Sequence, residues 1–255
     1  MNDGTLVRVF DLARGLRIVE LNRPEKRNAL STELLASLVE ALESSTLEGG
    51  IRVMILRGAG PIFCAGLDLQ EAQDNTKAAR SAELIARSLS LLAGTSAVTV
   101  AAVHGSAVAG GAGLMSACDF VLAAEATSIG YPEIHRGLVA GLVMTFLRRQ
   151  LRERDVRELL LLGEIISASR AKEIGLINEV VPADQLEARS MDLACRLMAG
   201  APEAVARTKR MIGELWHRGV DEDLHWAHEH HLSARGSKEA EEGMRAFFEK
   251  RKPTW

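Results

Sequence analysis

The sequence predicts an α/β fold that is followed by a helical C-terminal part. In the first half of the chain, short strand-like apolar runs alternate with helical patterns. The run Val98–Val103 is apolar apart from Thr99, as expected of a strand that is covered on both faces. The second half consists almost entirely of helical patterns. Alternation of strands and helices at this spacing is typical of an α/β core.

The elements of the first half follow from their local patterns. Strands are expected where short apolar runs stand between turn residues, and helices where apolar residues recur every three or four positions. One helix, capped by Ser31 or Thr32, carries Leu34 and Leu38 on its apolar face and runs to about Ser45. In chain order, we expect hairpin strands at Leu6–Phe10 and Leu16–Leu21, this helix, a strand at Val53–Leu56, a helix over Lys77–Leu92, the strand Val98–Val103, a small-residue turn at Gly105–Gly113, and strands at Phe120–Ala123 and Ser128–Gly130.

The second half is expected to be helical apart from one strand at Glu179–Val181. This change of pattern predicts two parts, an α/β core domain over residues 1–195 and a helical C-terminal region over 196–255. The helical region could pack on itself or on a neighbouring subunit. The expected helices are Leu142–Gly163, Ser169–Ile174, Gln185–Ala199, Pro202–Arg218, Asp221–Ser233 and Ser237–Phe248.

Composition and charge exclude several classes of protein. Hydrophobic residues make up 47% and charged residues 25% of the 255, which is ordinary for a soluble globular protein. The net charge of −3 gives no general attraction to nucleic acid or anionic membranes, so any polyanion must meet a local cationic patch. No apolar run is long enough to span a bilayer. With no signal-peptide pattern at the N-terminus and three scattered cysteines, a cytoplasmic location with reduced thiols is expected.

Well-known catalytic motifs are absent from the sequence. It contains no GxxxxGK[ST], so a nucleotide P-loop is not expected, and Gly105–Gly113 does not read GxGxxG. Neither GxSxG nor HExxH occurs, so the sequence gives no support to a serine-hydrolase or zincin mechanism.

Two glycine-containing turns resemble each other physically. Phe63–Leu69 and Ala107–Gly113 each follow an apolar strand and lead into a helix-like segment. Glycine lets the backbone approach a ligand closely, and a helix N-terminus presents free N–H groups. Two such donors that converge on one oxygen make an oxyanion hole. Tight turns with close helix–strand packing would give the same pattern, so spacing alone leaves both interpretations open.

Glu133 is the carboxylate of interest, because it follows Pro132 directly after an expected strand. In an apolar pocket its pKa would rise toward the range useful for proton transfer. The alternative is a first-turn glutamate that is favoured only by the helix dipole.

Five of the seven histidines fall between His217 and His231. His225 and His228 could share a helix face with Glu229, which makes a metal site conceivable. A solvated helix face is the more common reason for such a pattern, and no metal is predicted. The other members of the cluster are His230 and His231.

Six segments in order resemble the enoyl-CoA hydratase/isomerase (crotonase) superfamily over essentially the whole chain. One motif would be weak evidence, whereas six in sequence with the expected spacing are strong. The segments are Asn22–Leu30, Phe63–Leu69, Ala101–Asp119 with its Gly110–Gly111 pair, Tyr131–Val139, Ala171–Pro182 and Gly243–Arg251.

The resemblance implies a fold and a set of binding residues. The fold is a spiral of ββα units with a helical C-terminal trimerisation region, assembled as a homotrimer or as a dimer of trimers. The implied substrate is an acyl-CoA thioester, whose oxygen is held by the backbone N–H groups of Leu67 and Gly110. No separate cofactor is expected, because coenzyme A is part of the substrate. Positions that match the family's coenzyme A contacts are Lys26, Arg27, Ala29, Ala65, Leu67 and Leu69, with Phe247 and Lys250 contributed from a neighbouring subunit.

One departure from the family pattern affects the expected reaction. Hydratases of the family carry two glutamates; Glu133 matches the second, but the first falls on Gly113, which has no side chain. Water addition needs a base for the water and an acid for the α-carbon. A single carboxylate therefore favours a proton shuttle in an isomerase, with Glu133 as the acid/base.

Other reactions stay open at this point. Hydration with Glu133 alone, or with a histidine in place of the second acid, is one, and decarboxylation, C–C cleavage or thioester hydrolysis on the same oxyanion hole are others. A non-catalytic acyl-CoA or RNA binder is a further alternative, although a net acidic chain with 4% aromatic residues argues against RNA. Candidates for the acyl pocket are Tyr131, His135, Val143, Met144 and Phe146.

Overall fold

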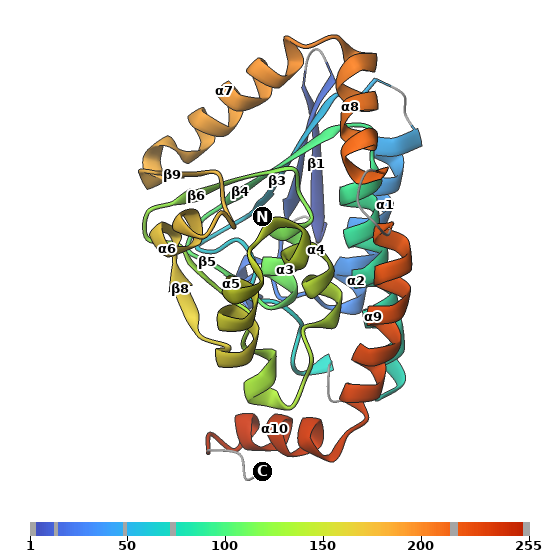
Figure 1. Cartoon of the computed structure of the whole chain (residues 1–255), viewed down its shortest axis with the longest axis vertical. Coiled ribbons are helices and arrows are strands. Elements are labelled where there is room, and N and C mark those ends of the chain that lie inside the picture. The colour runs from blue at the N-terminus through green and yellow to red at the C-terminus, as the bar shows by residue number, and fades with distance from the viewer. Residues whose placement is uncertain (1–3, 13–14, 48–49, 72–74, 215–218, 252–255) are drawn as a thin grey trace.

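Residues 4–12, 15–47, 50–71, 75–214 and 219–251 are described in a computed structural model of the chain. Over these residues, two sheets and a set of surrounding helices form the molecule, and α8 (Pro202–Glu214) and α9 (Val220–Arg235) run along one side (Figure 1). No helix among these residues is long and apolar enough to cross a membrane.

The larger sheet has the strand order β1-β2-β3-β4-β6-β9. Its first two strands form the predicted antiparallel hairpin, and each later neighbour pairs in parallel. Every residue of β2 and β4 is buried, as the continuous apolar run of β4 predicts. The strands are β1 (Val7–Leu12), β2 (Leu16–Leu21), β3 (Val53–Gly58), β4 (Val98–Val103), β6 (Phe120–Ala124) and β9 (Glu179–Val181).

Helices cover both faces of this sheet. The side chains of Ile18, Ile55 and Val100 pack on one face against α7 (Leu186–Met198), which forms a small second core. The opposite face packs into the main core with α1 (Thr32–Leu47) and α2 (Asn75–Gly94). The apolar periodicity of these helices therefore corresponds to burial against the sheet.

A smaller sheet of β5 (Ser106–Val108), β7 (Ser128–Gly130) and β8 (Ile165–Ser167) lies beside the larger one. The expectation of a single strand in the second half of the chain is wrong, because β8 pairs antiparallel with β7. The expected turn at Gly105–Gly113 likewise contains β5, and it ends in α3 (Gly110–Ser116). Strands this short carry too little alternation to be told from loops.

The single helix expected over Leu142–Gly163 is interrupted. It consists of α4 (Gly141–Gln150), α5 (Glu153–Arg157) and a π-helical turn, Glu158–Leu162. Leu151 is extended and buried between the first two, so the break keeps its side chain in the core. No proline or glycine marks this break, which is why the sequence pattern does not show it.

The remaining helices agree with their predicted positions within a few residues. They are α6 (Ala168–Glu173), α8 (Pro202–Glu214), α9 (Val220–Arg235) and α10 (Lys238–Phe248). Helix α9 packs along α2 and α4, while α10 crosses the lower end of the molecule in Figure 1. The C-terminal end of the predicted Pro202–Arg218 helix lies outside the described residues.

Of the three thiols, Cys64 and Cys118 are buried and Cys195 is exposed on α7. Burial raises the pKa of Cys64 and of Cys118 to about 12. Both buried thiols are therefore neutral and unreactive at neutral pH.

Candidate active site

The turn Phe63–Leu69 is held between two other segments by backbone pairing. At one end, Cys64 pairs in parallel with Ala107. At the other, the N–H of Leu30 donates to Gly66 O at 2.8 Å and the N–H of Asp68 donates to Leu30 O at 3.2 Å. In a parallel bridge the residue between these two groups turns its own N–H away from the partner. The Leu67 N–H therefore points away from Leu30, and it makes no backbone hydrogen bond with the described residues.

The second turn ends at Gly110, the first residue of α3. Ala109 precedes it with φ of 51°, a left-handed conformation that a residue with a Cβ rarely adopts. This conformation is fixed in part by the Ala109 N–H, which donates to Gly130 O of β7 at 2.8 Å. The Gly110 N–H belongs to the first turn of the helix, where donors have no partner within the helix.

Gly66 brings the two turns together. Its φ is +87°, and a Cβ at this position would lie 2.7 Å from Val108 O, 3.0 Å from the Ala109 Cβ and 3.5 Å from Gly110 N. The absence of a side chain therefore permits contact between the turn that carries Leu67 and the start of α3.

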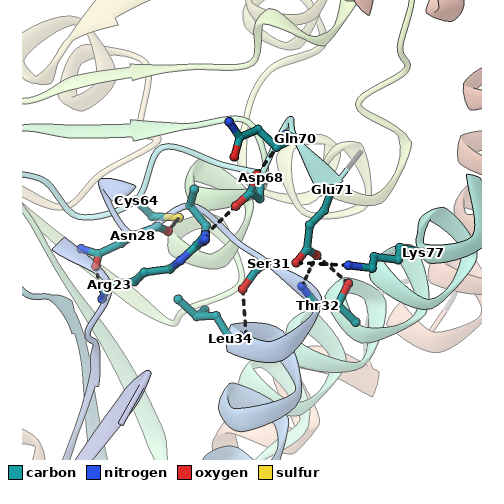
Figure 2. Close-up of polar contacts among 11 residues, drawn as sticks. Arg23, Asn28, Ser31, Thr32, Leu34, Cys64, Asp68, Gln70, Glu71 and Lys77 are labelled. Carbon is teal, nitrogen blue, oxygen red and sulfur yellow. Dashed lines mark hydrogen bonds and ion pairs between the residues drawn. The ribbon is translucent and has the colours of Figure 1, made fainter. Parts of the chain in front are cut away.

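Polar contacts connect the first turn with the preceding loop, as Figure 2 shows for Arg23 and Asp68. The amide of Asn28, which is fully buried, donates to the carbonyls of Ala59, Ile62 and Phe63. Arg23 pairs with Asp68 at 2.6 Å and thereby ties the end of the turn to the preceding loop. These contacts fix the backbone on both sides of Leu67.

The same view shows how α1 begins. The Ser31 hydroxyl accepts from the Leu34 N–H at 3.2 Å, which makes Ser31 the capping residue of the two expected. The Glu71 carboxylate accepts from both the N–H and the hydroxyl of Thr32, and Lys77 lies 3.9 Å from it. The segment after the first turn is thus attached to the N-terminus of α1.

A narrow, mainly apolar cavity of about 80 Å³ lies where the two turns meet. Of the candidates for the acyl pocket, Val143 lines it, whereas Tyr131 is sealed in the core with its hydroxyl on Ser116, 2.8 Å away. His135, Met144 and Phe146 do not line it. The wall consists of Ala65, Leu67, Leu69, Ile85, Leu89, Val108, Ala109, Gly110, Gly113, Glu133, Arg136, Leu138, Val139, Ala140, Gly141, Leu142 and Val143.

Glu133 is the carboxylate of this cavity. It lies on the 3₁₀ helix η4 (Pro132–Arg136), where Pro132 begins the turn. Its Oε2 is enclosed and makes no hydrogen bond with the described residues. Burial raises the pKa of Glu133 from 4.5 to about 7, against the opposing effects of its own backbone N–H and the positive charge of Arg136. A carboxyl group with this pKa can take up or release a proton at neutral pH.

At position 113 the wall of the cavity contains no acid. Gly113 is buried in α3, and a Cβ there would lie 2.4 Å from the Val143 Cγ1. The Val143 side chain therefore occupies the space that a larger residue at position 113 would need. Among the described lining residues, Glu133 is the only carboxylate.

The loop with the expected coenzyme A contacts adjoins the first turn. Lys26 and Arg27 are exposed, and neither makes an ion pair with the described residues. Arg27 has φ of 54°, and its carbonyl accepts from the Ala65 N–H at 3.0 Å. Ala29 is half-buried beside them. Lys26 and Arg27 thus place two positive charges without ion-pair partners among the described residues on a segment that is hydrogen-bonded to Ala65 at the cavity. The net charge of the whole chain is negative.

The C-terminal positions lie at the end of α10. The Phe247 ring packs on Arg136 of the same chain, with the guanidinium carbon 5.1 Å from the ring centroid. Lys250 follows the helix and is exposed. A second groove, lined by Leu67, Leu69 and several α10 residues, continues from the rim of the cavity toward this helix.

The histidine cluster does not form a metal site in the described part of the chain, where no group of three or more histidine, cysteine or acidic side chains converges. His225 is exposed and lies 3.8 Å from Glu229. His217 lies outside the described residues.

Sequence reasoning did not single out Arg136, which lines the cavity one turn after Glu133. A usable signal was present: a basic residue three positions from the candidate acid, in the same short turn, must lie near it.

Comparisons with known proteins identify the family of the chain and its fold. The enoyl-CoA hydratase/isomerase family profile matches residues 11–255. A Thermus thermophilus protein with a provisional enoyl-CoA hydratase name is 38% identical over 242 residues, covering 92% of this chain and 95% of its own. The enoyl-CoA isomerase/hydratase of Mycosarcoma maydis is 36% identical over 256 residues, covering 94% and 92%. The crystal structure of an enoyl-CoA hydratase from Mycobacterium avium subsp. paratuberculosis superposes with a TM-score of 0.87 at 26% identity, covering 98% of both chains.

The two sheets, the C-terminal helices and a cavity at the junction of two glycine turns define a crotonase-type α/β protein. The chain belongs to the enoyl-CoA hydratase/isomerase family, whose members act on acyl-CoA thioesters.

Proposed function

We propose that this chain moves the double bond of an enoyl-CoA thioester, with Glu133 as the proton carrier. The supporting observation is that Val143 occupies the space beside Gly113 in which a second acidic side chain would have to lie. One carboxylate is sufficient to carry a proton between two carbons of the same substrate, whereas water addition commonly uses two groups.

The proposed reaction has two proton transfers. The Glu133 carboxylate removes a proton from C2 of a 3-enoyl thioester, and the electrons move onto the thioester oxygen. The N–H groups of Leu67 and Gly110 donate to this oxygen, which carries negative charge in the dienolate. The Glu133 carboxylic acid then returns the proton at C4, so that the double bond lies between C2 and C3 and the enzyme is regenerated.

Substrate binding is assigned to the rim of the cavity. Lys26 and Arg27 would attract the phosphates of coenzyme A, because both cations lack a counter-ion among the described residues. Backbone groups of Ala29, Ala65 and Leu69 would contact the adenine and pantetheine parts. Phe247 and Lys250 of a neighbouring subunit would complete the site.

Hydration is the second candidate, because relatives with hydratase names are frequent among the similar proteins. In this version Glu133 alone would activate water and protonate the α-carbon. The relative from Mycosarcoma maydis carries both activities in its name, so both reactions require a test.

The test offers the purified protein two substrates, crotonyl-CoA and a 3-enoyl-CoA. We expect a gain of absorbance from the conjugated thioester with the 3-enoyl substrate and no loss with crotonyl-CoA.

Glu133→Gln should lower kcat by about 10²–10⁴-fold and leave acyl-CoA binding intact, since general acid–base catalysis contributes on this scale. Glu125→Gln, at an exposed position, is the matched control. Loss of absorbance with crotonyl-CoA would identify hydration instead, and an unchanged rate in Glu133→Gln would remove this residue from the mechanism.

We also infer that the chain forms a homotrimer or a dimer of trimers, and that the helical region 196–255 acts as a unit distinct from the core 1–195. Exposed large apolar side chains at Leu161, Leu162 and Ile165 support the inferred assembly, because single chains rarely leave such groups in water together.

A further inference from the structure

Arg136 lines the cavity with a guanidinium group that has few partners. Its backbone is fixed: Gly137 ends η4 in a left-handed conformation, and Gly243 of α10 lies so close that a Cβ there would be 2.4 Å from the Arg136 carbonyl carbon. The side chain is therefore held at the cavity by contacts on both sides of the residue.

The bonding of the guanidinium is incomplete. Its one hydrogen bond with the described residues runs from Nη1 to Pro132 O at 3.2 Å, and one face packs on the Phe247 ring. Nε is buried and makes no hydrogen bond, and no carboxylate within the described residues forms an ion pair with the group. Glu133 is close enough to interact electrostatically with the Arg136 guanidinium, but the two side chains do not form an ion pair.

An arrangement of this kind is energetically unfavourable unless something else supplies negative charge. Arginine keeps its proton even when partly buried, and a desolvated charge without a counter-ion is unfavourable. Glu133 offers no compensation when it holds the transferred proton. The free Nε belongs to the edge of the guanidinium that binds a carboxylate through two parallel hydrogen bonds.

We propose that Arg136 binds a carboxylate carried by the acyl group, so that the preferred substrate is the coenzyme A monothioester of a dicarboxylic acid. The inference rests on the proposed function, because it assumes that the cavity holds the acyl group of a thioester. It adds a second recognition element: the oxyanion donors fix one end of the acyl group, and Arg136 fixes the other.

The phosphates of coenzyme A are the other source of negative charge, and the geometry disfavours them. The whole pantetheine arm separates them from the thioester, whereas Arg136 lies one helical turn from Glu133 in an apolar wall. Lys26 and Arg27, which are exposed on the adjoining loop, suit the phosphates better.

Binding of thioesters that lack a double bond tests the proposal separately from isomerisation. Malonyl-CoA and succinyl-CoA are compared with isovaleryl-CoA and isocaproyl-CoA, in which methyl groups replace the two carboxylate oxygens, and with free coenzyme A. Titration calorimetry is run on the wild type, Arg136→Gln, Arg136→Lys and the control Arg148→Gln, whose arginine is exposed at the far end of α4.

We expect the wild type and Arg148→Gln to prefer at least one dicarboxylic thioester over its neutral counterpart. Arg136→Gln should reduce this preference by about 10–100-fold, the scale of a charged hydrogen-bonded pair, while its affinity for free coenzyme A stays the same. Arg136→Lys keeps the charge and should retain part of the preference, which separates loss of charge from loss of fold.

Three results would overturn the proposal. One is a wild-type preference for the neutral thioesters. Another is an equal loss of affinity for free coenzyme A and the dicarboxylic thioesters in Arg136→Gln, which would assign the contact to a phosphate. If the wild type binds neither coenzyme A nor any thioester, the proposed function itself fails, and this inference with it.

Discussion

Glu133 combines a raised pKa with a buried oxygen that makes no hydrogen bond to the described residues, in a wall that is mainly apolar. The sequence identified this residue and also showed that position 113 lacks an acid. It could not show that Val143 fills the space beside Gly113, because that contact joins two helices. The spacing of Arg136 from Glu133 was a usable signal that the two lie close together, but only the fold shows that the guanidinium lines the cavity.

The charge of Glu133 should make stability depend on pH. The folded state holds the proton up to a pKa of about 7, whereas the unfolded chain releases it near 4.5. Between these values the folded state binds more protons, so the free energy of unfolding falls as pH rises and then levels off above 7. The Glu133→Gln variant cannot lose a proton at this position, so its free energy of unfolding does not fall in this way. At pH 8 the variant should therefore be more stable than the wild type by about 1–3 kcal/mol.

Thermal unfolding of both proteins at pH 5 and pH 8 measures this effect. Glu125→Gln, which is exposed, should show no such change between the two conditions. An equal difference between Glu133→Gln and the wild type at both pH values would contradict the raised pKa.

At the level of elements, local pattern located the long helices and the buried strands but not the short pieces. The α1 cap and β4 could be predicted because a capping hydroxyl and a continuous apolar run are local signals. β5 and β8 exist because β7 lies between them, and that pairing is not local. The break at Leu151 likewise depends on where the core lies.

Gly66 provides a test of the turn that carries Leu67. Gly66→Ala would place a Cβ against Val108 O and the Ala109 side chain, and it would strain a φ of +87°. We expect a loss of about 1–3 kcal/mol in the free energy of unfolding, together with a strong loss of turnover, because the two N–H groups would be pushed apart.

Gly175→Ala is the matched control for this variant. Gly175 has φ of +85°, but nothing lies within 4 Å of its added Cβ. The control should lose stability through backbone strain and keep its activity. Equal turnover in the two alanine variants would show that the contact between the turns is not needed for catalysis.

At the scale of the whole molecule, the sequence predicted an α/β core and a helical end, but not how the strands are ordered. The order β1-β2-β3-β4-β6-β9 and the separate sheet of β5, β7 and β8 arise from pairing between distant segments. Periodicity reports which face of an element is apolar and not which partner covers it. The family resemblance, rather than any local pattern, supplied the architecture.

The inferred assembly gives a prediction at this scale. We expect light scattering during size-exclusion chromatography to give a mass of three or six times 27.6 kDa. Replacing Leu161 and Leu162 by serine should shift the mass toward a single chain if these exposed side chains lie in the interface. A wild-type mass of one chain at micromolar concentration would rule the trimer out.

The groups assigned to the thioester oxygen belong to peptide bonds, and this has a consequence for how such a protein can evolve. A point mutation to any residue except proline leaves an N–H at positions 67 and 110, so the binding of the oxygen is inherited with the fold. The side chains of the wall, Glu133, Arg136 and Val143 among them, can change without removing these N–H groups, whereas a side chain at Gly113 also requires a smaller residue in place of Val143. New substrates and new fates for the same intermediate are therefore accessible by single substitutions, without rebuilding the part that stabilises it.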